Sequence, residues 1–246
     1  MEKQYVLLWL ESPLQSWGAD SKFGRRDTLP FPTRSGVLGM ILAAMGASGE
    51  QRDLLKRFEG LPQTVYSFLG TKEENGQKRK KQREPLLCDF QMIGSGYDEE
   101  NPWENLMIPK TPAGTRAVGG GTKLTYRYYL QDAFFAVILE LPSDLASSVA
   151  DWLQHPVFDI YLGRKDCVPA DFVFRGSYMS FDEAIEVMNN IANEKHLKVD
   201  LKVIDGEHPE ENGDVLTLND VPIQFGTSKK YRDRRVTIIQ LLETYV

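Results

Sequence analysis

The sequence has few cysteine and histidine residues and no long hydrophobic run. Its 246 residues include two cysteines, Cys88 and Cys167, and three histidines. The cysteines lie far apart, with neither CxxC spacing nor paired histidines nearby, which argues against a disulfide framework and against a zinc site. No apolar run is long enough to span a bilayer, and no signal-type segment comes before the first apolar strand. We therefore expect a cytoplasmic protein that uses no membrane, no metal and no other cofactor.

Common catalytic and nucleotide-binding motifs are also missing. The sequence has no HExxH, no GxSxG and no GxGxxG after its first apolar strand. Segment 114–123 (GTRAVGGGTK) lacks the Gly-Lys-Ser/Thr step of a phosphate-binding loop. The aromatic signature of RNA-recognition domains is absent as well, so base stacking on a sheet face is not the expected binding mode. None of the histidines falls in a motif-bearing segment, and none is expected to be catalytic.

The net charge of −6 is unevenly distributed along the chain. Residues 1–130 hold 18 Lys and Arg against 15 Asp and Glu, whereas residues 131–246 hold 11 against 20. The acidic residues are densest in segment 182–220. A nucleic-acid site requires a basic surface rather than a basic total. The net charge therefore leaves a nucleic-acid partner open, and it predicts an acidic face that points away from that partner.

Hydrophobic periodicity predicts a mixed chain of helices and strands. The expected strands are 5–10, 63–69, 86–93, 133–141, 158–161, 173–179, 197–204, 215–218 and 236–242, and the expected helices are 37–45, 52–59, 143–154 and 182–194. Segment 71–84 is charged and almost free of apolar side chains, which predicts an exposed hairpin tip or a disordered loop. The order of elements is that of a ferredoxin-like, RRM-like α+β unit with antiparallel pairing.

Segment 31–39 (FPTRSGVLG) predicts the start of a buried helix. Pro32 favours an extended residue before it, and Thr33 and Ser35 are good capping residues. The free N–H groups and the dipole of a helix start attract anions, and Arg34 adds a positive charge there. Two interpretations stay open, a phosphate site and a capped core helix with one solvent-facing arginine.

Two further segments favour RNA as the ligand. Segment 115–129 combines Lys and Arg, hydroxyls, glycines and three tyrosines, as a hairpin that contacts a single strand would. The alternative is a surface hairpin whose tyrosines pack on the core. Segment 161–169 (YLGRKDCVP) presents two cations beside an aromatic side chain, which suits phosphates or base edges. Its alternative is a solvated turn.

Four motifs, in this order, resemble those of the CasD family, the type I-E Cascade subunit that holds the 5′ handle of CRISPR RNA (crRNA). They are 12–18 (SPLQSWG), 31–46 (FPTRSGVLGMILAAMG), 128–139 (YYLQDAFFAVIL) and 161–167 (YLGRKDC). The resemblance spans about residues 4–180 and is looser beyond, chiefly through 222–226 (PIQFG). It implies a fold of the RAMP superfamily, with a ferredoxin-like domain over 1–180, a β-hairpin thumb inserted at about 71–130, and an acidic C-terminal α/β extension over 181–246 packed on the same domain.

The resemblance also implies a function in antiviral defence. The chain would be a non-catalytic, crRNA-binding subunit of a type I-E Cascade ribonucleoprotein that caps the 5′ handle and contacts the guide-target duplex with its thumb. Its partners would be crRNA, the backbone and large Cascade subunits and, through the assembled complex, target DNA. The implied RNA-binding residues are Trp17, Thr33, Arg34, Ser35, Gly163, Arg164 and Lys165 at the handle, Arg116, Lys123 and Tyr126 in the thumb, and Arg25 and Arg26, which are assigned to neither part.

Three points stay open at this stage. A related branch of the superfamily cleaves precursor RNA without metal, using Tyr, Lys and His. The alternative function is therefore a metal-independent endoribonuclease that processes CRISPR repeat RNA, although the chain carries the I-E motifs instead of that branch's pattern. A third possibility is a protein whose basic loops bind another protein. The basic run 78–81 departs from the family, and it is either an RNA contact or a solvated tip.

Overall fold

The structure, a computed structural model, describes residues 2–18, 24–74, 77–93, 100–103, 110–111, 113–115 and 123–241. Its strands are β1 (Lys3–Gln15), β2 (Trp17–Gly18), β3 (Arg25–Arg26), β4 (Thr28–Leu29), β5 (Gln63–Glu74), β6 (Gln77–Lys80), β7 (Leu87–Ile93), β8 (Lys123–Pro142), β9 (Phe174–Tyr178), β10 (Leu197–Asp205), β11 (Asp214–Gln224) and β12 (Lys230–Gln240). Its helices are α1 (Arg34–Ala44), α2 (Arg52–Arg57), α4 (Ser143–Gln154), α5 (Phe181–Glu194) and the short 3-10 helix η1 (Pro209–Glu211).

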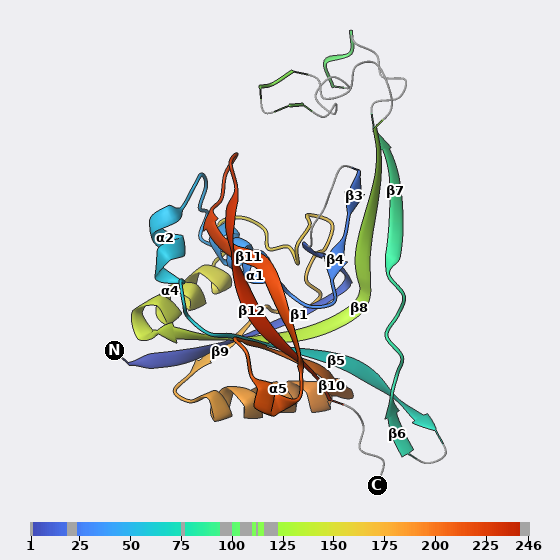
Figure 1. Cartoon of the computed structure of the whole chain (residues 1–246), viewed down its shortest axis with the longest axis vertical. Helices are drawn as coiled ribbons and strands as arrows, with labels where there is room; N and C mark the ends of the chain where they lie inside the picture. The colour runs from blue at the N-terminus through green and yellow to red at the C-terminus, as the bar shows by residue number, and fades with distance from the viewer. Residues whose placement is uncertain are drawn as a thin grey trace.

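One large sheet organises the chain, as Figure 1 shows. Its strands follow the order β11-β12-β10-β5-β8-β1-β9, and all of these neighbours pair in antiparallel fashion. The predicted mixed α/β chain with antiparallel pairing is confirmed. Among the described residues, no helix is long and apolar enough to cross a membrane.

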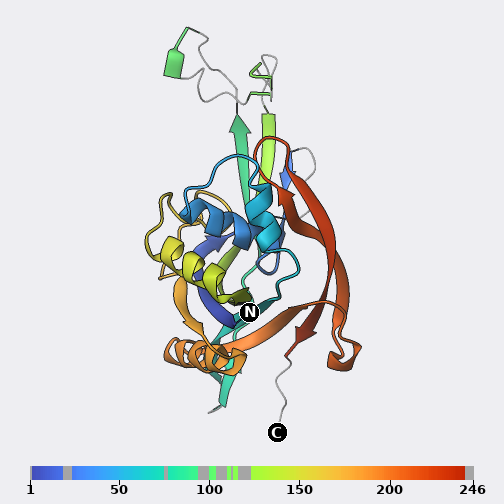
Figure 2. The ribbon, with the colours of Figure 1, turned by 90° about the vertical axis from the view of Figure 1, so that its left-hand side faces the viewer.

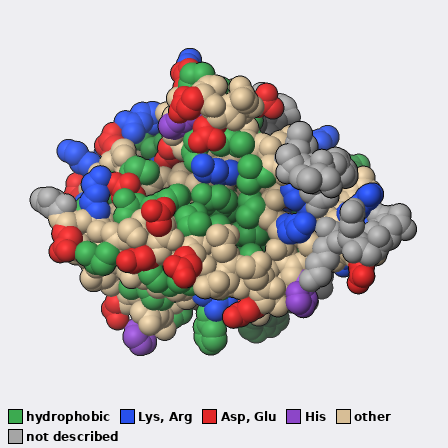
Figure 3. All heavy atoms as spheres, turned by 90° about the horizontal axis from the view of Figure 1, so that it is seen from below, with side chains coloured by type: hydrophobic (Ala, Val, Ile, Leu, Met, Phe, Trp, Pro, Cys, Tyr) green, Lys and Arg blue, Asp and Glu red, His purple; other side chains and the backbone are tan. Residues whose placement is uncertain are grey.

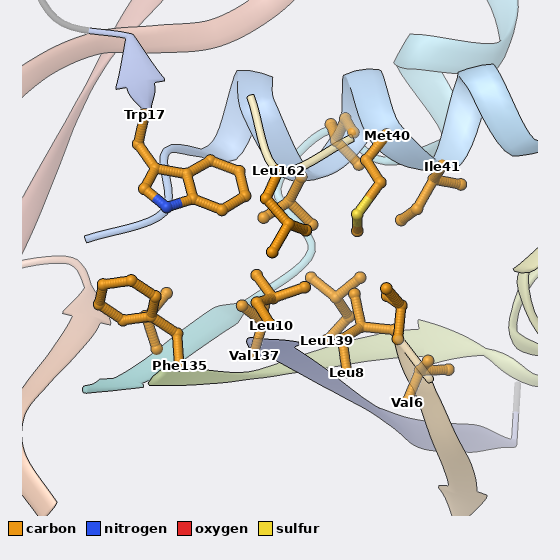
Figure 4. Packing of buried hydrophobic residues seen from close by; sticks show 14 of the residues in the cluster. Val6, Leu8, Leu10, Trp17, Met40, Ile41, Phe135, Val137, Leu139 and Leu162 are labelled. Atoms are coloured by element: carbon orange, nitrogen blue, oxygen red, sulfur yellow. The ribbon is translucent and has the colours of Figure 1, made fainter. Parts of the chain in front are cut away.

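The two central strands are apolar on both faces because helices cover both sides of the sheet. In β1, Val6, Leu8 and Leu10 point to one core cluster, and Leu7 and Trp9 point to the other. Successive side chains of a strand alternate between faces, so a doubly covered strand must be apolar throughout. Figure 4 shows the first cluster, where β1 and β8 side chains meet those of α1.

Helices α1 and α4 lie on one face of the sheet, and α5 lies on the other, as Figures 1 and 2 show. Strand β8 alternates in step with β1: Phe135 and Val137 face α1, and Ala136 and Ile138 face the α5 side. Helix α5 contributes Ala184, Met188 and Ala192 to that second cluster. The sheet is therefore the middle layer of three.

The last three strands extend the sheet beyond β5 and curve back toward α1 and α2 (Figure 2). Strand β10 pairs with β5 and β12, and β12 pairs with β11. Strand β11 contacts both α1 and α2. The acidic C-terminal segment thus reaches the helix that begins in segment 31–39.

A two-stranded ribbon formed by β7 and the first part of β8 projects from the body of the molecule (Figure 1). Four apolar side chains that face each other in this register are partly exposed: Phe90 with Tyr126, and Met92 with Leu124. The Phe90 and Tyr126 ring centroids are 5.2 Å apart. One face of the ribbon is therefore an exposed apolar strip.

Three local predictions need correction or completion. The predicted strand 158–161 is wrong, because the N–H groups of Val157 and Phe158 donate to carbonyls at the end of α1, at 2.8 and 3.3 Å, and no strand forms there. Strand β8 is longer than predicted and continues through Asp132, which has a φ of +43°. The charged segment 71–84 contains the hairpin of β5 and β6.

Candidate functional site

A groove of about 570 Å³ opens where α1 begins, beside the turn at Gly163 and the loop between β11 and β12. Its walls come from four parts of the chain that are distant in sequence. They are lined by Ser16, Gly18, Thr33, Ser35, Gly36, Gly39, Met40, Leu42, Ala43, Ala47, Ser48, Gly49, Gln51, Phe158, Tyr161, Gly163, Phe225, Gly226, Lys229 and Tyr231. Three of the four sequence motifs therefore meet in one place.

The backbone itself brings two of these motifs together. The N–H of Ser16 donates to the carbonyl of Leu162 at 3.1 Å. Gly163 follows with a φ of +98°, and a Cβ atom added there would lie 1.7 Å from the Ser16 carbonyl oxygen. Only glycine fits so close an approach in this conformation. The turn at Gly163 is thus held against the end of β1.

The Trp17 side chain packs against the start of α1, which belongs to the motif 31–46. Its side chain is fully buried, and a Cβ atom added at Gly36 would meet its ring at 2.8 Å. The indole Nε1 donates to Gln15 Oε1 at 3.1 Å. The Trp17 side chain therefore supports the first turn of α1, and the implied direct contact with RNA is not available to a ring with no exposed surface.

Thr33 and Ser35 lie at the start of α1 as the sequence predicts. Thr33 is the N-cap, and its Oγ1 accepts a hydrogen bond from the Gly36 N–H at 3.1 Å. Its side chain is fully buried, whereas Ser35 is half-buried and both residues line the groove. The start of α1 is one wall of the groove, and Ser35 is the more accessible hydroxyl there.

Arg34 points away from the groove into the protein. Only 6% of the residue is exposed, and its Nη2 donates to the carbonyls of Phe58 and Leu61, both at 2.6 Å. Its Nη1 donates to Asp205 at 3.0 Å. Burial lowers the pKa of the Arg34 guanidinium, and the Asp205 charge opposes that shift. The implied phosphate contact is corrected by this geometry, because the guanidinium already binds protein acceptors.

Arg34 belongs to a buried ionic network that joins α1 to the C-terminal strands. Asp220 accepts the backbone N–H of Arg34 at 2.7 Å and the Nε and Nη2 groups of Arg234 at 2.7 and 2.8 Å. Arg234 also pairs with Asp205. Burial lowers the pKa of Arg234, but Asp220 and Asp205 outweigh burial and raise it. The start of α1 is therefore locked to β10, β11 and β12.

Arg164 and Lys165 behave differently although they are adjacent. The Arg164 guanidinium lies 4.6 Å from the centroid of the Tyr129 ring and donates to the carbonyls of Tyr128 and Arg26, at 3.3 and 2.9 Å. It is half-buried, whereas Lys165 is exposed. Arg164 thus holds the turn against β3 and β8, and Lys165 is the cation that the turn presents to solvent.

The remaining predicted residues lie along β3 and β8. Strand β3 places Arg25 and Arg26 beside Tyr126 and Arg127 in a parallel pair. Both β3 arginines are exposed; Arg25 pairs with Asp27 at 2.8 Å and lies 4.7 Å from the Tyr128 ring centroid. Tyr126 is 44% exposed on the ribbon.

Two predicted thumb residues fall largely outside the described residues. Arg116 lies outside them, and for Lys123 only the backbone, paired with Ile93 in the ribbon, is described. Their predicted roles therefore stay predictions.

Sequence reasoning missed the wall that the C-terminal hairpin contributes. Phe225, Lys229 and Tyr231 line the groove, and the Phe225 ring lies over Gly39. The Phe225 N–H donates to the Glu50 carbonyl at 3.0 Å, which holds the hairpin loop against the loop after α1. Burial raises the pKa of Tyr231. The looser 222–226 motif was the available signal, but nothing in the sequence placed it beside α1.

Among the described residues, no histidine, cysteine or carboxylate side chain lines the groove. The three histidines all belong to the described chain, and none of them lines the groove. His155 pairs with Asp151, and His208 lies between Asp205 and Glu210. Among the residues that the structure describes, no group of three or more His, Cys, Asp or Glu side chains could hold a metal ion. The lining instead combines aromatic rings, glycines, hydroxyls and a lysine.

Comparisons with known proteins agree on one family. The family model described as CRISPR-associated protein (Cas_Cas5) matches residues 5–237. The chain is 28% identical over 190 residues to the CRISPR system Cascade subunit CasD of Escherichia coli (strain K12), covering 76% of this chain and 77% of that protein.

Two solved structures are also similar. A chain of a CRISPR RNA-guided surveillance complex has a TM-score of 0.68 at 30% identity, covering 96% of this chain and 89% of that chain. A structure described as a crystal structure of a Cas protein has a TM-score of 0.52 at 24% identity, covering 96% and 94%, and supports the fold alone.

Proposed function

Because the chain belongs to the CRISPR-associated Cas5 family, we propose that it is the crRNA-binding subunit of a type I-E Cascade surveillance complex and that its groove holds the 5′ handle. The observation that carries this proposal is the meeting of three motifs in one groove. SPLQSWG ends at the groove, FPTRSG begins its helix, and YLGRKDC supplies its turn. Its partners are then crRNA and the other Cascade subunits, and target DNA through the assembled complex.

The chemistry of the groove supports a single-stranded RNA ligand. Single strands are bound through stacking on aromatic rings and through contacts to the backbone. Phe158, Tyr161, Phe225 and Tyr231 supply rings, and Ser35 supplies a hydroxyl at the start of α1. Exposed Lys229 lines the groove, and exposed Lys165 follows the groove-lining turn at Gly163 by two residues, so both add positive charge there. The groove therefore suits a short, unpaired RNA segment better than a duplex.

The sheet topology supports a ferredoxin-like core within the RAMP superfamily. The order β5-β8-β1-β9, with α1 between β1 and β5 and α4 between β8 and β9, is the order of a split βαβ unit. In this proposal the first domain covers 1–180, and the extension 181–246 adds strands β10 to β12 to the same sheet and packs α5 on the face opposite α1. The β7–β8 ribbon is the base of the thumb, which would carry Tyr126, Lys123 and Arg116 toward the guide-target duplex.

A non-catalytic role is better supported than the endoribonuclease function. General acid-base cleavage of RNA requires a histidine or an equivalent group within hydrogen-bond reach of the reacting atoms. Tyr161, Lys229 and Tyr231 line the groove but no described histidine does, so the Tyr, Lys and His set of the related nucleases is incomplete there. The proposed subunit therefore retains the RNA and does not cut it.

Binding and cleavage assays separate the two functions. The purified chain with crRNA is expected to bind in a handle-dependent, salt-sensitive manner, and substitution of all three histidines by alanine should leave that affinity unchanged. Cleavage of a repeat hairpin in EDTA, lost in the histidine variant, would instead establish the endoribonuclease.

A further inference from the structure

A pocket of about 340 Å³ lies between α2 and the end of β11, and Figure 2 shows these two elements side by side. Among the described residues, none lines both this pocket and the groove. Exposed hydrophobic side chains alone do not indicate a partner, because most protein surfaces carry them. Figure 3 shows such side chains among Lys, Arg, Asp and Glu on the face seen from below. A hollow with an apolar interior is a more specific feature.

The interior of the pocket is apolar. Leu38 of α1, Leu55 of α2, Phe58 and Val221 line it, and each of them is at most 9% exposed. Ile223 also lines the pocket but is 46% exposed, so it belongs to the mouth. An apolar side chain that enters would lose its contact with water and pack against these residues. Interface residues that fill such pockets contribute most of the binding free energy.

Hydrogen bonds hold both walls of the pocket in place. On the α2 side, Arg34 Nη2 donates to the Phe58 carbonyl at 2.6 Å. On the β11 side, Gln224 Nε2 donates to Glu50 Oε1 at 3.1 Å, and the Phe225 N–H donates to the Glu50 carbonyl at 3.0 Å. A site that is already formed costs little ordering when a partner binds.

The charges at the mouth are balanced. Arg52 pairs with a glutamate at 2.9 Å, and Arg232 pairs with another glutamate. Lys56 and Asp53, both exposed, add one charge of each sign. Such a mouth gives no net attraction to a polyanion, which argues against a nucleic acid as the occupant. An apolar centre within a polar, charged rim is instead the usual composition of a protein–protein interface.

The pocket is adjacent to the groove on two stretches of the chain. Gln51 lines the groove and the next residue, Arg52, lines the pocket. Likewise Tyr231 lines the groove and Arg232 lines the pocket. A molecule in the pocket therefore lies next to the ligand that fills the groove.

We infer that this pocket receives an apolar side chain from a neighbouring protein subunit, beside the handle end of the crRNA. The inference rests on the proposed function, because the other subunits of the Cascade complex supply that neighbour. The segment that carries the side chain is expected to have no large net charge, which matches the balanced mouth. A charge introduced at Ile223 should then block the contact, because it would be buried without a partner.

Photo-crosslinking in the complex reconstituted from crRNA and the other Cascade subunits tests the inference. p-Benzoylphenylalanine replaces Ile223 or, as the matched control, Val215. Val215 lies near the other end of β11, is 44% exposed and does not line the pocket. Position 223 should give an adduct with another protein subunit that position 215 does not give. Adducts from position 223 only with RNA, only with a second copy of this chain, or with no molecule would overturn the inference, and so would the same adduct in equal yield from both positions.

The affinity of the chain for the rest of the complex provides a second test. Ile223→Lys should weaken this association about tenfold or more, whereas Val215→Lys should not. Equal melting temperatures of the two variants would show that folding is unaffected. Both variants should bind handle RNA like the wild type, since neither residue lines the groove. A wild-type chain without handle affinity would refute the handle proposal, whereas unchanged association of Ile223→Lys would refute the pocket.

Discussion

Gly163 lies against Ser16 so closely that a Cβ atom added at Gly163 would be 1.7 Å from the Ser16 carbonyl oxygen. This contact joins two motifs separated by more than half of the chain, and it sets the floor of the groove. Because Gly163 also has a φ of +98°, its side-chain-free backbone is required for two independent reasons. The geometry of the groove depends on this pair.

Gly163→Ala should therefore both destabilise the protein and weaken handle binding. The positive φ alone costs about 1–3 kcal/mol for a residue with a Cβ atom. The clash adds to this cost, because the Ser16 carbonyl belongs to the backbone and must shift. Chemical denaturation and RNA titration measure the two effects.

Gly60→Ala is the matched control for this prediction. Gly60 has a φ of +72°, and nothing lies within 4 Å of an added Cβ atom. Its substitution should cost about 1–2 kcal/mol and leave RNA affinity unchanged. Equal losses of stability and equal RNA affinity in the two variants would show that the Ser16 contact has no role.

Arg34→Met should lower stability by about 3–5 kcal/mol, because it removes one member of a buried ionic network and leaves carbonyls without their donor. The exposed pair of Arg232 with Glu59 is the control, and Arg232→Gln should cost about 0–1 kcal/mol. Urea denaturation gives both values.

The salt slope of RNA binding should not change in Arg34→Met. A slope reduced by about 1, with stability intact, would restore Arg34 as a phosphate contact.

Substitutions of Arg164 and of Lys165 should differ in their effects on protein stability and on RNA binding. Lys165→Gln is expected to make the salt slope of handle binding shallower by about 1 with no change in stability, because this side chain is exposed. Arg164→Gln should lower the melting temperature as well, since it removes the contact with the Tyr129 ring and two hydrogen bonds. Identical behaviour of the two variants in calorimetry would contradict this division.

Cys167 should resist thiol reagents while the protein is folded. Burial raises the pKa of its thiol to about 11 from an ordinary value of 9.0, so almost no thiolate exists near pH 8. Cys88 is exposed and should be modified at once. Maleimide labelling followed by mass spectrometry is expected to give one adduct on the folded chain and two after denaturation.

The same shift predicts a loss of stability at high pH. The unfolded thiol ionises near pH 9 whereas the folded thiol stays protonated, so the unfolded state binds fewer protons between pH 9 and about 11. The stabilising contribution is complete below pH 9 and is lost as the pH rises through this range. Cys167→Ala should remove this part of the pH dependence of the free energy of unfolding, measured against Cys88→Ala.

Most elements of the fold could be predicted because their periodicity is local. Helix α5 repeats at helical spacing and was expected within one residue of its observed bounds, whereas β1 was expected over its apolar part, 5–10, and extends over Lys3–Gln15. Strand 158–161 was wrong because its hydrogen bonds go to the end of α1, a partner distant in sequence. The full length of β8 was missed because Asp132 interrupts the pattern without ending the strand.

The sequence motifs contain residues that the structure brings together in one groove, but they did not predict which way the side chains point. The motifs mark where Ser35 and Gly163 lie, and these do line the groove. Which way Arg34 points depends on Asp205, which is far along the chain and whose neighbours no local pattern identifies. The Phe225 and Tyr231 wall was missed for the same reason. The sequence showed which residues carry a charge or an aromatic ring. Only the tertiary structure showed which way each of those side chains points.

The most direct test of the central claim is photo-crosslinking from the groove in the reconstituted crRNA complex. Tyr231 is replaced by p-benzoylphenylalanine, and the crosslinked RNA is mapped by primer extension. Phe172, which is 81% exposed and does not line the groove, is the control position. We predict crosslinks from position 231 to the 5′ handle and none from position 172. Crosslinks from position 231 only to protein, or only to RNA beyond the handle, would contradict the assignment of the groove.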